Sequence, residues 1–289
     1  MPLQIKSRVN DTEKHSLDIT ALIFNNNKLY SASDDGKIKV WDKNLKLLDE
    51  VIAHPCSVFS ITIGDNRIYS CSNDGFVKSW PLNNLQCEEI VLQEPNEMYK
   101  VNFNDGKLYV GDDAGLVRIF CKSTMVGVLE IMHPIADLLA LGNLIYTARD
   151  LYVLVSEIHP ETKRMATVKA IEGRSPVCVI GEKLCFTNRG GKDILLHSNS
   201  KASEFQQIAV AKDAHELIIT ALCGHSDGDQ EWLYSGGWDK VVKRWRIASE
   251  LTLVDTCPLD VPITSITMGN NGELYVGGAD GNIYCVTYH

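Results

Sequence analysis

Histidine, serine and aspartate, the residue types of a hydrolytic triad, recur together along this chain. The recurring sets are His15, Ser33, Asp35 and Trp41; His54, Ser72, Asp74 and Trp80; and His215, Asp239 and Trp245, in which glycine stands at the serine position. A catalytic set is normally unique in a chain, whereas this one is repeated. We therefore interpret each set as a structural brace. In it, aspartate holds the histidine ring, histidine meets the serine hydroxyl, and serine reaches the indole N–H.

A second candidate for chemistry is the segment Gly224-His225-Ser226-Asp227-Gly228, which fits the G-x-S-x-G pattern of a serine nucleophile. That pattern needs a strand before the serine and a helix after it. Here the surrounding sequence, GHSDGDQEW, lies between two strand-like segments and is rich in acidic residues. We interpret it as an elongated hairpin loop and the match as accidental.

Other candidate sites are weaker. The turn from Asn188 to Lys192 is basic and contains two glycines, so its backbone N–H groups could hold an anion. It stands where other repeats carry an Asp-Gly turn, however, and an ordinary hairpin turn is the better interpretation. His54 and Cys56 are two residues apart, but no second pair of possible zinc ligands is nearby. We therefore predict no catalytic residue, no metal and no cofactor.

The elements that must position these residues are repeated units. Each unit has a short apolar segment that ends in an aromatic residue, then small residues, then a turn. The aromatic residues are Tyr30, Tyr69, Tyr109, Tyr146, Phe186, Tyr234 and Tyr275, spaced by 39, 40, 37, 40, 48 and 41 residues. A period of this length is typical of repeat architectures, and it divides the chain into seven units.

Each unit reads as four strands. Alternating segments such as ITALIF and KIKVW flank the aromatic residue, and Asp-Gly pairs favour tight hairpins between them. The last unit lacks a fourth strand, which residues 2–10 can supply. We therefore predict one all-β domain over residues 1–289, a seven-bladed β-propeller of four-stranded antiparallel blades that the N-terminal strand closes. The expected blades are roughly residues 13–51, 52–92, 93–131, 132–171, 172–212, 213–258, and 259–289 with 2–10.

The recurring residues resemble the WD-repeat family. Its pattern has histidine at the start of a repeat, serine or threonine on the second strand, aspartate in the next turn, and Trp-Asp ending the third strand. The first unit matches throughout and ends in Trp41-Asp42, whereas the second has Pro81 after its tryptophan. The third to fifth and the seventh units keep less of the pattern. The resemblance implies a non-catalytic propeller whose partners dock on the face with the narrower central opening.

Composition restricts the partners and the cellular compartment that can be expected for this protein. The 289 residues carry a net charge of −9, which argues against nucleic-acid binding because phosphate recognition needs a basic field. No signal peptide and no run of 18 apolar residues is found, so no membrane association is expected. The nine cysteines form no CxxC pair, and we interpret them as reduced core residues. These features predict an intracellular protein, in the cytoplasm or the nucleus, with no small-molecule substrate.

Aligning the units places several large side chains at the rim of the narrow face. Aromatic residues dominate interface hot spots, so an exposed group of them predicts partner binding. The candidates are Phe59, Met98, Tyr99 and Trp238, with Arg149, Arg174 and Arg189 as a basic component. Such a rim suits an acidic or amphipathic peptide. The alternative is that Phe59 and Tyr99 turn inward and pack between blades.

The sequence therefore predicts a protein-interaction scaffold or adaptor, one subunit of a larger complex that holds a partner peptide or helix. Three alternatives remain. A substrate receptor of a ubiquitin ligase would resemble propellers with Trp-Asp-x-Arg at a blade end, which no repeat here shows. A propeller enzyme would need polar side chains converging on the axis. A non-catalytic subunit of an RNA-modifying enzyme would need a basic stripe.

Overall fold

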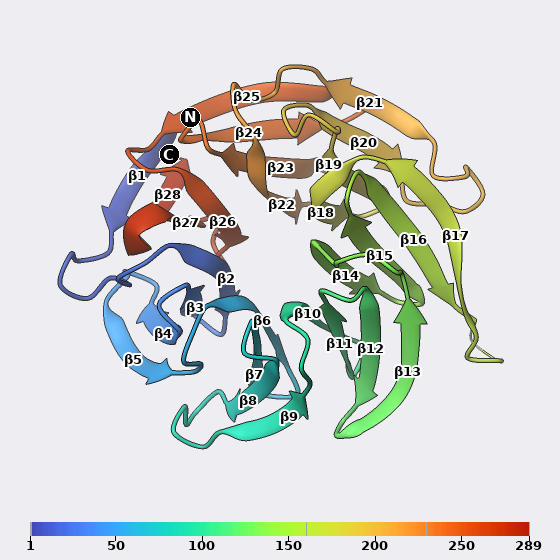
Figure 1. The fold of residues 1–289 in the computed structure, drawn as a ribbon. Helices are drawn as coiled ribbons and strands as arrows, with labels where there is room; N and C mark the ends of the chain where they lie inside the picture. The colour runs from blue at the N-terminus through green and yellow to red at the C-terminus, as the bar shows by residue number, and fades with distance from the viewer. Residues whose placement is uncertain (1, 160, 229, 289) are drawn as a thin grey trace.

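Seven sheets stand around a central axis like the blades of a propeller (Figure 1). This is a computed structural model, and it describes residues 2–159, 161–228 and 230–288. Within them the chain forms 28 strands and one short 3-10 helix, Ala279–Gly281. Every sheet has four strands, so the predicted class, a seven-bladed all-β propeller, is confirmed.

In the first six blades the four strands follow one another from the axis outward. Blades one to three are β2 (Ile19–Asn25), β3 (Lys28–Ser33), β4 (Lys37–Asp42) and β5 (Leu47–Ile52); β6 (Val58–Gly64), β7 (Arg67–Ser72), β8 (Phe76–Pro81) and β9 (Glu89–Gln93); and β10 (Met98–Asn104), β11 (Lys107–Asp112), β12 (Leu116–Cys121) and β13 (Thr124–Glu130). Blades four to six are β14 (Asp137–Leu141), β15 (Leu144–Arg149), β16 (Tyr152–Ile158) and β17 (Met165–Glu172); β18 (Arg174–Ile180), β19 (Lys183–Thr187), β20 (Ile194–Ser198) and β21 (Gln207–Ala211); and β22 (Ile219–Asp227), β23 (Gln230–Gly237), β24 (Val241–Ile247) and β25 (Leu251–Pro258).

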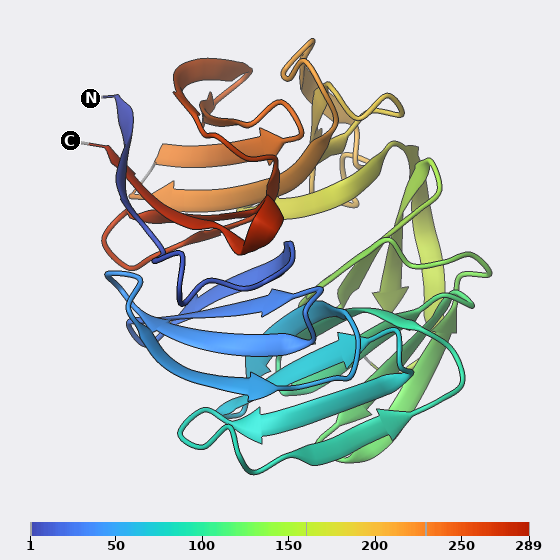
Figure 2. The same ribbon diagram turned by 60° about the vertical axis from the view of Figure 1, so that its left-hand side comes forward.

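Blade seven joins the two ends of the chain. Its inner strands are β26 (Ile263–Met268), β27 (Leu274–Gly278) and β28 (Ile283–Tyr288), and its outer strand is β1 (Leu3–Arg8). The pairing of β1 with β28 is antiparallel, with Leu3 opposite Tyr288 (Figure 2). The predicted closure by the N-terminal strand is therefore confirmed, and β28 has no open edge.

The apolar core lies between the blades. Seven clusters of buried side chains each join neighbouring blades, so that each blade buries both of its faces. Second strands are consequently buried almost throughout, as in β3 and β7, whereas outer strands such as β17 are mostly exposed. The repeated aromatic residue belongs to this core, and Tyr30, Tyr109, Tyr146 and Tyr275 are almost fully buried.

Two further features bear on the sequence-based expectations. No helix in the described part of the chain is long and apolar enough to cross a membrane. All nine cysteines are free thiols, and burial raises the pKa of Cys185 and Cys223 to about 12. These two thiols therefore stay protonated and unreactive near neutral pH.

Candidate functional site

Antiparallel pairing brings two kinds of connection to one end of every blade. The loop into each first strand and the turn between the second and third strands meet there, and we call this side of the ring the turn face. Backbone hydrogen bonds join the two connections. In blade one, for example, Asp34 N–H donates to Asp18 O over 3.1 Å. This is the face on which the sequence predicts partner binding.

The brace of blade one lies just beneath the turn face. His15 Nδ1 lies 3.0 Å from both carboxylate oxygens of Asp35, and its Nε2 lies 2.8 Å from Ser31 Oγ. Trp41 Nε1 donates to the same Ser31 oxygen over 2.8 Å. A carboxylate only accepts hydrogen bonds, so Nδ1 carries the proton and Nε2 accepts from the serine hydroxyl. The four side chains therefore form one directed chain of hydrogen bonds.

The serine in this chain differs from the predicted one. Ser31 and not Ser33 bonds to histidine in blade one, Ser70 and not Ser72 does so in blade two, and Ser235 fills the place in blade six. Ser33 instead closes the hairpin turn, because its Oγ donates to Leu17 O and accepts from Asp35 N–H. Alternate strand residues share a face, so both serines face the histidine and only depth separates them. The missed signal is that each brace serine directly follows the buried tyrosine of its repeat.

Blades two and six differ in how fully the brace forms. In blade six, Trp245 Nε1 donates to Ser235 Oγ over 2.8 Å, as in blade one. In blade two, His54 lies 2.8 Å from both Asp74 and Ser70, but Trp80 Nε1 is buried without a partner among the described residues. The predicted serine–tryptophan contact is therefore wrong for blade two.

The burial of the brace histidines fits a structural role. Burial lowers the pKa of His15, His54 and His215, although each neighbouring aspartate opposes this change. These three histidine side chains have no exposed surface, so a substrate on the outside of the protein has no path to them. The geometry of a triad is present three times, each time sealed beneath a turn.

The G-x-S-x-G match lies in a hairpin. Strand β22 runs through Ser226 to Asp227, and β23 begins at Gln230, with Ser226 opposite Glu231. The predicted elongated hairpin is confirmed and supplies part of the 48-residue spacing, and the rest lies between Phe186 and the start of β22. In the described part of the chain, no three side chains among histidine, cysteine, aspartate and glutamate form a cluster able to hold a metal ion.

The predicted rim residues occupy three different environments. Met98 is fully buried in the core between blades two and three, so it offers no surface to a partner and its assignment is corrected. Phe59 and Tyr99 are half-buried and pack edge to face, with ring centroids 5.4 Å apart. Trp238 is 59% exposed on the turn between β23 and β24. Met98 faces inward because it is the first residue of its inner strand, a position that is also buried at Ile19 and Val58.

The predicted arginines are spread over blades four and five, and the side chains of two of them have partners within the protein. Arg149 Nη1 donates to Ile131 O over 3.0 Å. Arg189 pairs with Glu172 over 2.8 Å. Arg174 is half-buried. They do not form one continuous basic rim, and their role in partner binding stays a prediction.

Two exposed apolar residues beside Trp238 escaped the sequence analysis. Leu217 and Ile218 are 48% and 39% exposed in the loop into β22. Trp238 N–H donates to Ile218 O over 3.0 Å, which places the three residues together, and we call them the blade-six patch. The sequence does contain a signal for this exposed apolar group. Alignment of HELIITAL in blade six with HSLDITAL in blade one places Ile218 at the position of Asp18.

Comparison with known proteins agrees with this architecture. Residues 7–42 and 206–246 match the family model "WD domain, G-beta repeat". Among solved structures, the chain is similar to the WD40 β-propeller domain of Doa1, with a TM-score of 0.83 at 15% identity over 99% of this chain and 97% of that one. It is also similar to the computationally designed Ika8 protein, with a TM-score of 0.70 at 19% identity over 96% and 98% of the two chains. No curated protein gives a significant match.

The fold and the repeated braces define a seven-bladed β-propeller. Two segments of the chain match the model of the WD-repeat family, and the whole chain has the fold of a WD40 β-propeller domain. Propellers of this family generally serve as protein-interaction scaffolds and generally lack catalytic activity.

Proposed function

We propose that this protein is a non-catalytic scaffold or adaptor subunit that holds a peptide or helix of a partner on its turn face. The observation that carries the proposal is the blade-six patch. Trp238 is a large aromatic residue whose side chain is mostly exposed, and two exposed aliphatic residues adjoin it. Contiguous exposed apolar groups rimmed by polar residues are typical of protein-binding surfaces.

The surroundings of the patch indicate the chemistry of the partner. Lys192 lies at the edge of the patch. Its carbonyl oxygen accepts a hydrogen bond from His215 N–H, and the carbonyl oxygen of the adjoining Gly191 accepts one from Ile219 N–H. Lys240 is two residues beyond Trp238 and is also exposed. An amphipathic segment fits this surface, with apolar side chains on the patch and carboxylates toward the two lysines.

The patch also has rigid support. Asp239, which adjoins Trp238, holds the His215 ring at 2.8 Å in the brace of blade six. Glu216 N–H donates to the same carboxylate over 3.1 Å, so the loop and the turn are joined at one aspartate. A partner that binds the patch therefore meets a preformed surface, which limits the entropy lost on binding.

Affinity capture with cross-linking mass spectrometry from the native cells tests the proposal. The wild-type chain is compared with Trp238→Ala and with Leu253→Ala, which removes a 44% exposed leucine from the outer strand of the same blade. We expect a stable partner that cross-links near Lys192 and Lys240. Trp238→Ala should weaken its binding about 30-fold, the effect of a typical hot spot, and Leu253→Ala should leave it unchanged. Equal retention by both variants would place the partner elsewhere.

A further inference from the structure

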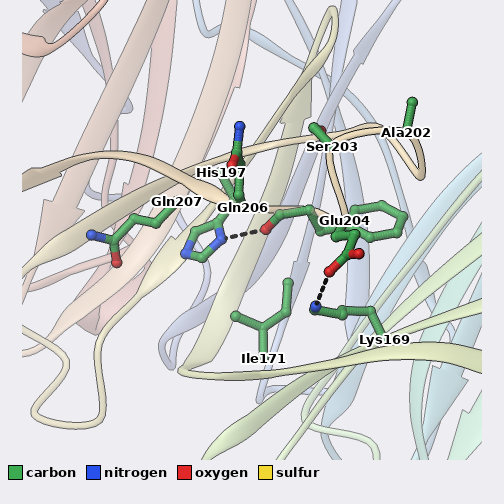
Figure 3. Close-up of a pocket in the computed structure, with 9 residues that line it drawn as sticks. Lys169, Ile171, His197, Ala202, Ser203, Glu204, Gln206 and Gln207 are labelled. Carbon is green, nitrogen blue, oxygen red and sulfur yellow. Dashed lines mark hydrogen bonds and ion pairs between the residues drawn. The ribbon is translucent and has the colours of Figure 1, made fainter.

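A groove runs along the side of the propeller between blades four and five. Its walls are the outer strand β17 on one side, and β20, β21 and residues 199–206 on the other. Two hollows of about 650 and 400 Å³ meet in it and share Ile171, His197 and Gln207. Figure 3 shows the residues that line the first of them. The blade-six patch contributes no residue to either hollow.

His197 is the polar group at the centre of this groove. Its Nδ1 lies 2.8 Å from Phe205 O, and since a carbonyl only accepts, Nδ1 carries the proton. Nε2 is therefore a bare acceptor. It is buried and has no hydrogen-bond partner among the described residues, and His197 as a whole residue is 6% exposed. Buried polar groups are normally paired, so an orphaned acceptor that lines a hollow indicates a missing donor.

The ring is fixed in this orientation. It stacks on Phe186 with the ring centroids 4.9 Å apart, and Phe186 is itself fully buried. Burial lowers the pKa of His197, against the effect of its bond to the Phe205 carbonyl. The imidazole therefore stays neutral, and Nε2 keeps its acceptor lone pair at physiological pH.

Charges in the groove cancel within the protein. Lys169 of β17 pairs with Glu204 across the groove over 3.9 Å. Glu172, also in β17, pairs with Arg189 of blade five over 2.8 Å. What remains for a ligand includes the apolar surface of Ile171, the amides of Gln206 and Gln207, and the bare nitrogen of His197. This composition favours an uncharged ligand that carries a hydrogen-bond donor.

We infer that the groove between blades four and five binds an extended, uncharged peptide segment of a partner protein, which donates an N–H to His197 Nε2. An extended backbone supplies evenly spaced neutral donors and acceptors. The exposed amide of Gln207 can pair with such groups in both senses. The peptide's apolar side chains would contact Ile171 and the apolar surface beside it in the groove. The inference is independent of the turn-face proposal, because the two sites share no residue.

A phage-displayed library of random 12-residue peptides, panned against the intact chain, tests this site. Selected peptides are synthesised with capped ends and titrated by fluorescence anisotropy. His197→Phe keeps a ring on Phe186 but removes the acceptor. Gln207→Trp fills the groove from an exposed position and leaves His197 in place, so it tests the site even where the first variant disturbs residues 199–206. Trp238→Ala serves as the matched control on the turn face.

The inference is supported by uncharged peptides whose affinity falls about tenfold or more in both groove variants and is unchanged in Trp238→Ala. Binding should also shift the Nε2 resonance of His197 in long-range ¹H–¹⁵N spectra. It is overturned by peptides that bind equally to Gln207→Trp, by peptides that depend on Trp238 alone, by selection of charged sequences only, or by the absence of any enriched sequence.

Discussion

Ser31 Oγ lies 2.8 Å from Trp41 Nε1, so a residue at the centre of β3 connects the tryptophan of β4 to the histidine that precedes the blade. The serine hydroxyl makes two hydrogen bonds, because it accepts from the indole and donates to His15. In blade two the equivalent Ser70 reaches His54, but Trp80 Nε1 is left without a partner among the described residues. Blade one should therefore depend more strongly on its brace serine than blade two.

Replacing the two brace serines tests this difference. Ser31→Ala leaves two buried groups unpaired, on His15 and Trp41, and should lower the free energy of unfolding by about 2–4 kcal/mol. Ser70→Ala leaves only His54 unpaired and should cost about 1–3 kcal/mol. Urea denaturation followed by tryptophan fluorescence measures both. A cost for Ser31→Ala no greater than that for Ser70→Ala would contradict the connected chain of hydrogen bonds.

Much of the fold could be predicted because it depends on periodicity. The buried tyrosines, the Asp-Gly turns and the missing last strand determine the number of blades and their closure, and each of these is local in the sequence. Periodicity does not show how far along a strand, below the turn face, a given contact forms. Ser31 and Ser33 have the same residue type and face the same side, so alternation cannot tell which one meets His15.

The candidate sites were harder to predict, because exposure and pairing depend on neighbouring blades. Met98 and Trp238 are both large apolar residues near the turn face, yet one is fully buried and the other 59% exposed. The orphaned nitrogen of His197 depends on a carbonyl eight residues away and on a strand of another blade. No pattern within one repeat indicates such an arrangement.

Stability should fall as the solution becomes more acidic than about pH 6.5. Burial lowers the pKa of His15, His54, His197 and His215 below the unfolded value of about 6.5. Below that pH the unfolded chain takes up protons that the folded chain resists. The contribution of these buried, neutral histidines to the free energy of unfolding is therefore complete above pH 6.5. It is lost as the pH falls toward the pKa values of the folded protein.

Urea midpoints measured at pH 8.0, 6.5 and 5.5 check this dependence. Carboxylates with ordinary pKa values near 4 contribute little to the slope in this range. His15→Gln should reduce the slope, whereas His159→Gln, at an exposed position, should leave it as in the wild type. A wild-type midpoint that stays level or rises on acidification would be inconsistent with neutral buried histidines.

The closing strand should contribute to stability through one side chain in particular. Leu3 of β1 is 5% exposed and packs with Leu274, Tyr284 and Val286, whereas Ile5 on the same strand is 47% exposed. Leu3→Ala should cost about 2–5 kcal/mol, the range for truncating a buried leucine. Ile5→Ala should cost less than about 0.5 kcal/mol, as for most surface substitutions. Equal thermal midpoints for the two variants would show that β1 does not close the ring in solution.

The junction between blade seven and blade one should be intolerant of any side chain at Gly281. This glycine has a φ of +71°, and a Cβ added to it would lie 1.9 Å from His15 O, in backbone that the brace of blade one holds in place. Gly106 offers a matched comparison, since its φ is +70° but no atom lies within 4 Å of an added Cβ. Gly106→Ala should cost about 1–2 kcal/mol, the strain of the left-handed backbone alone. Gly281→Ala should cost more than about 3 kcal/mol, because the backbone must also move. Urea denaturation of both variants measures the two losses in the free energy of unfolding. Similar losses would mean that the backbone at the junction moves to accept the added methyl group without further strain.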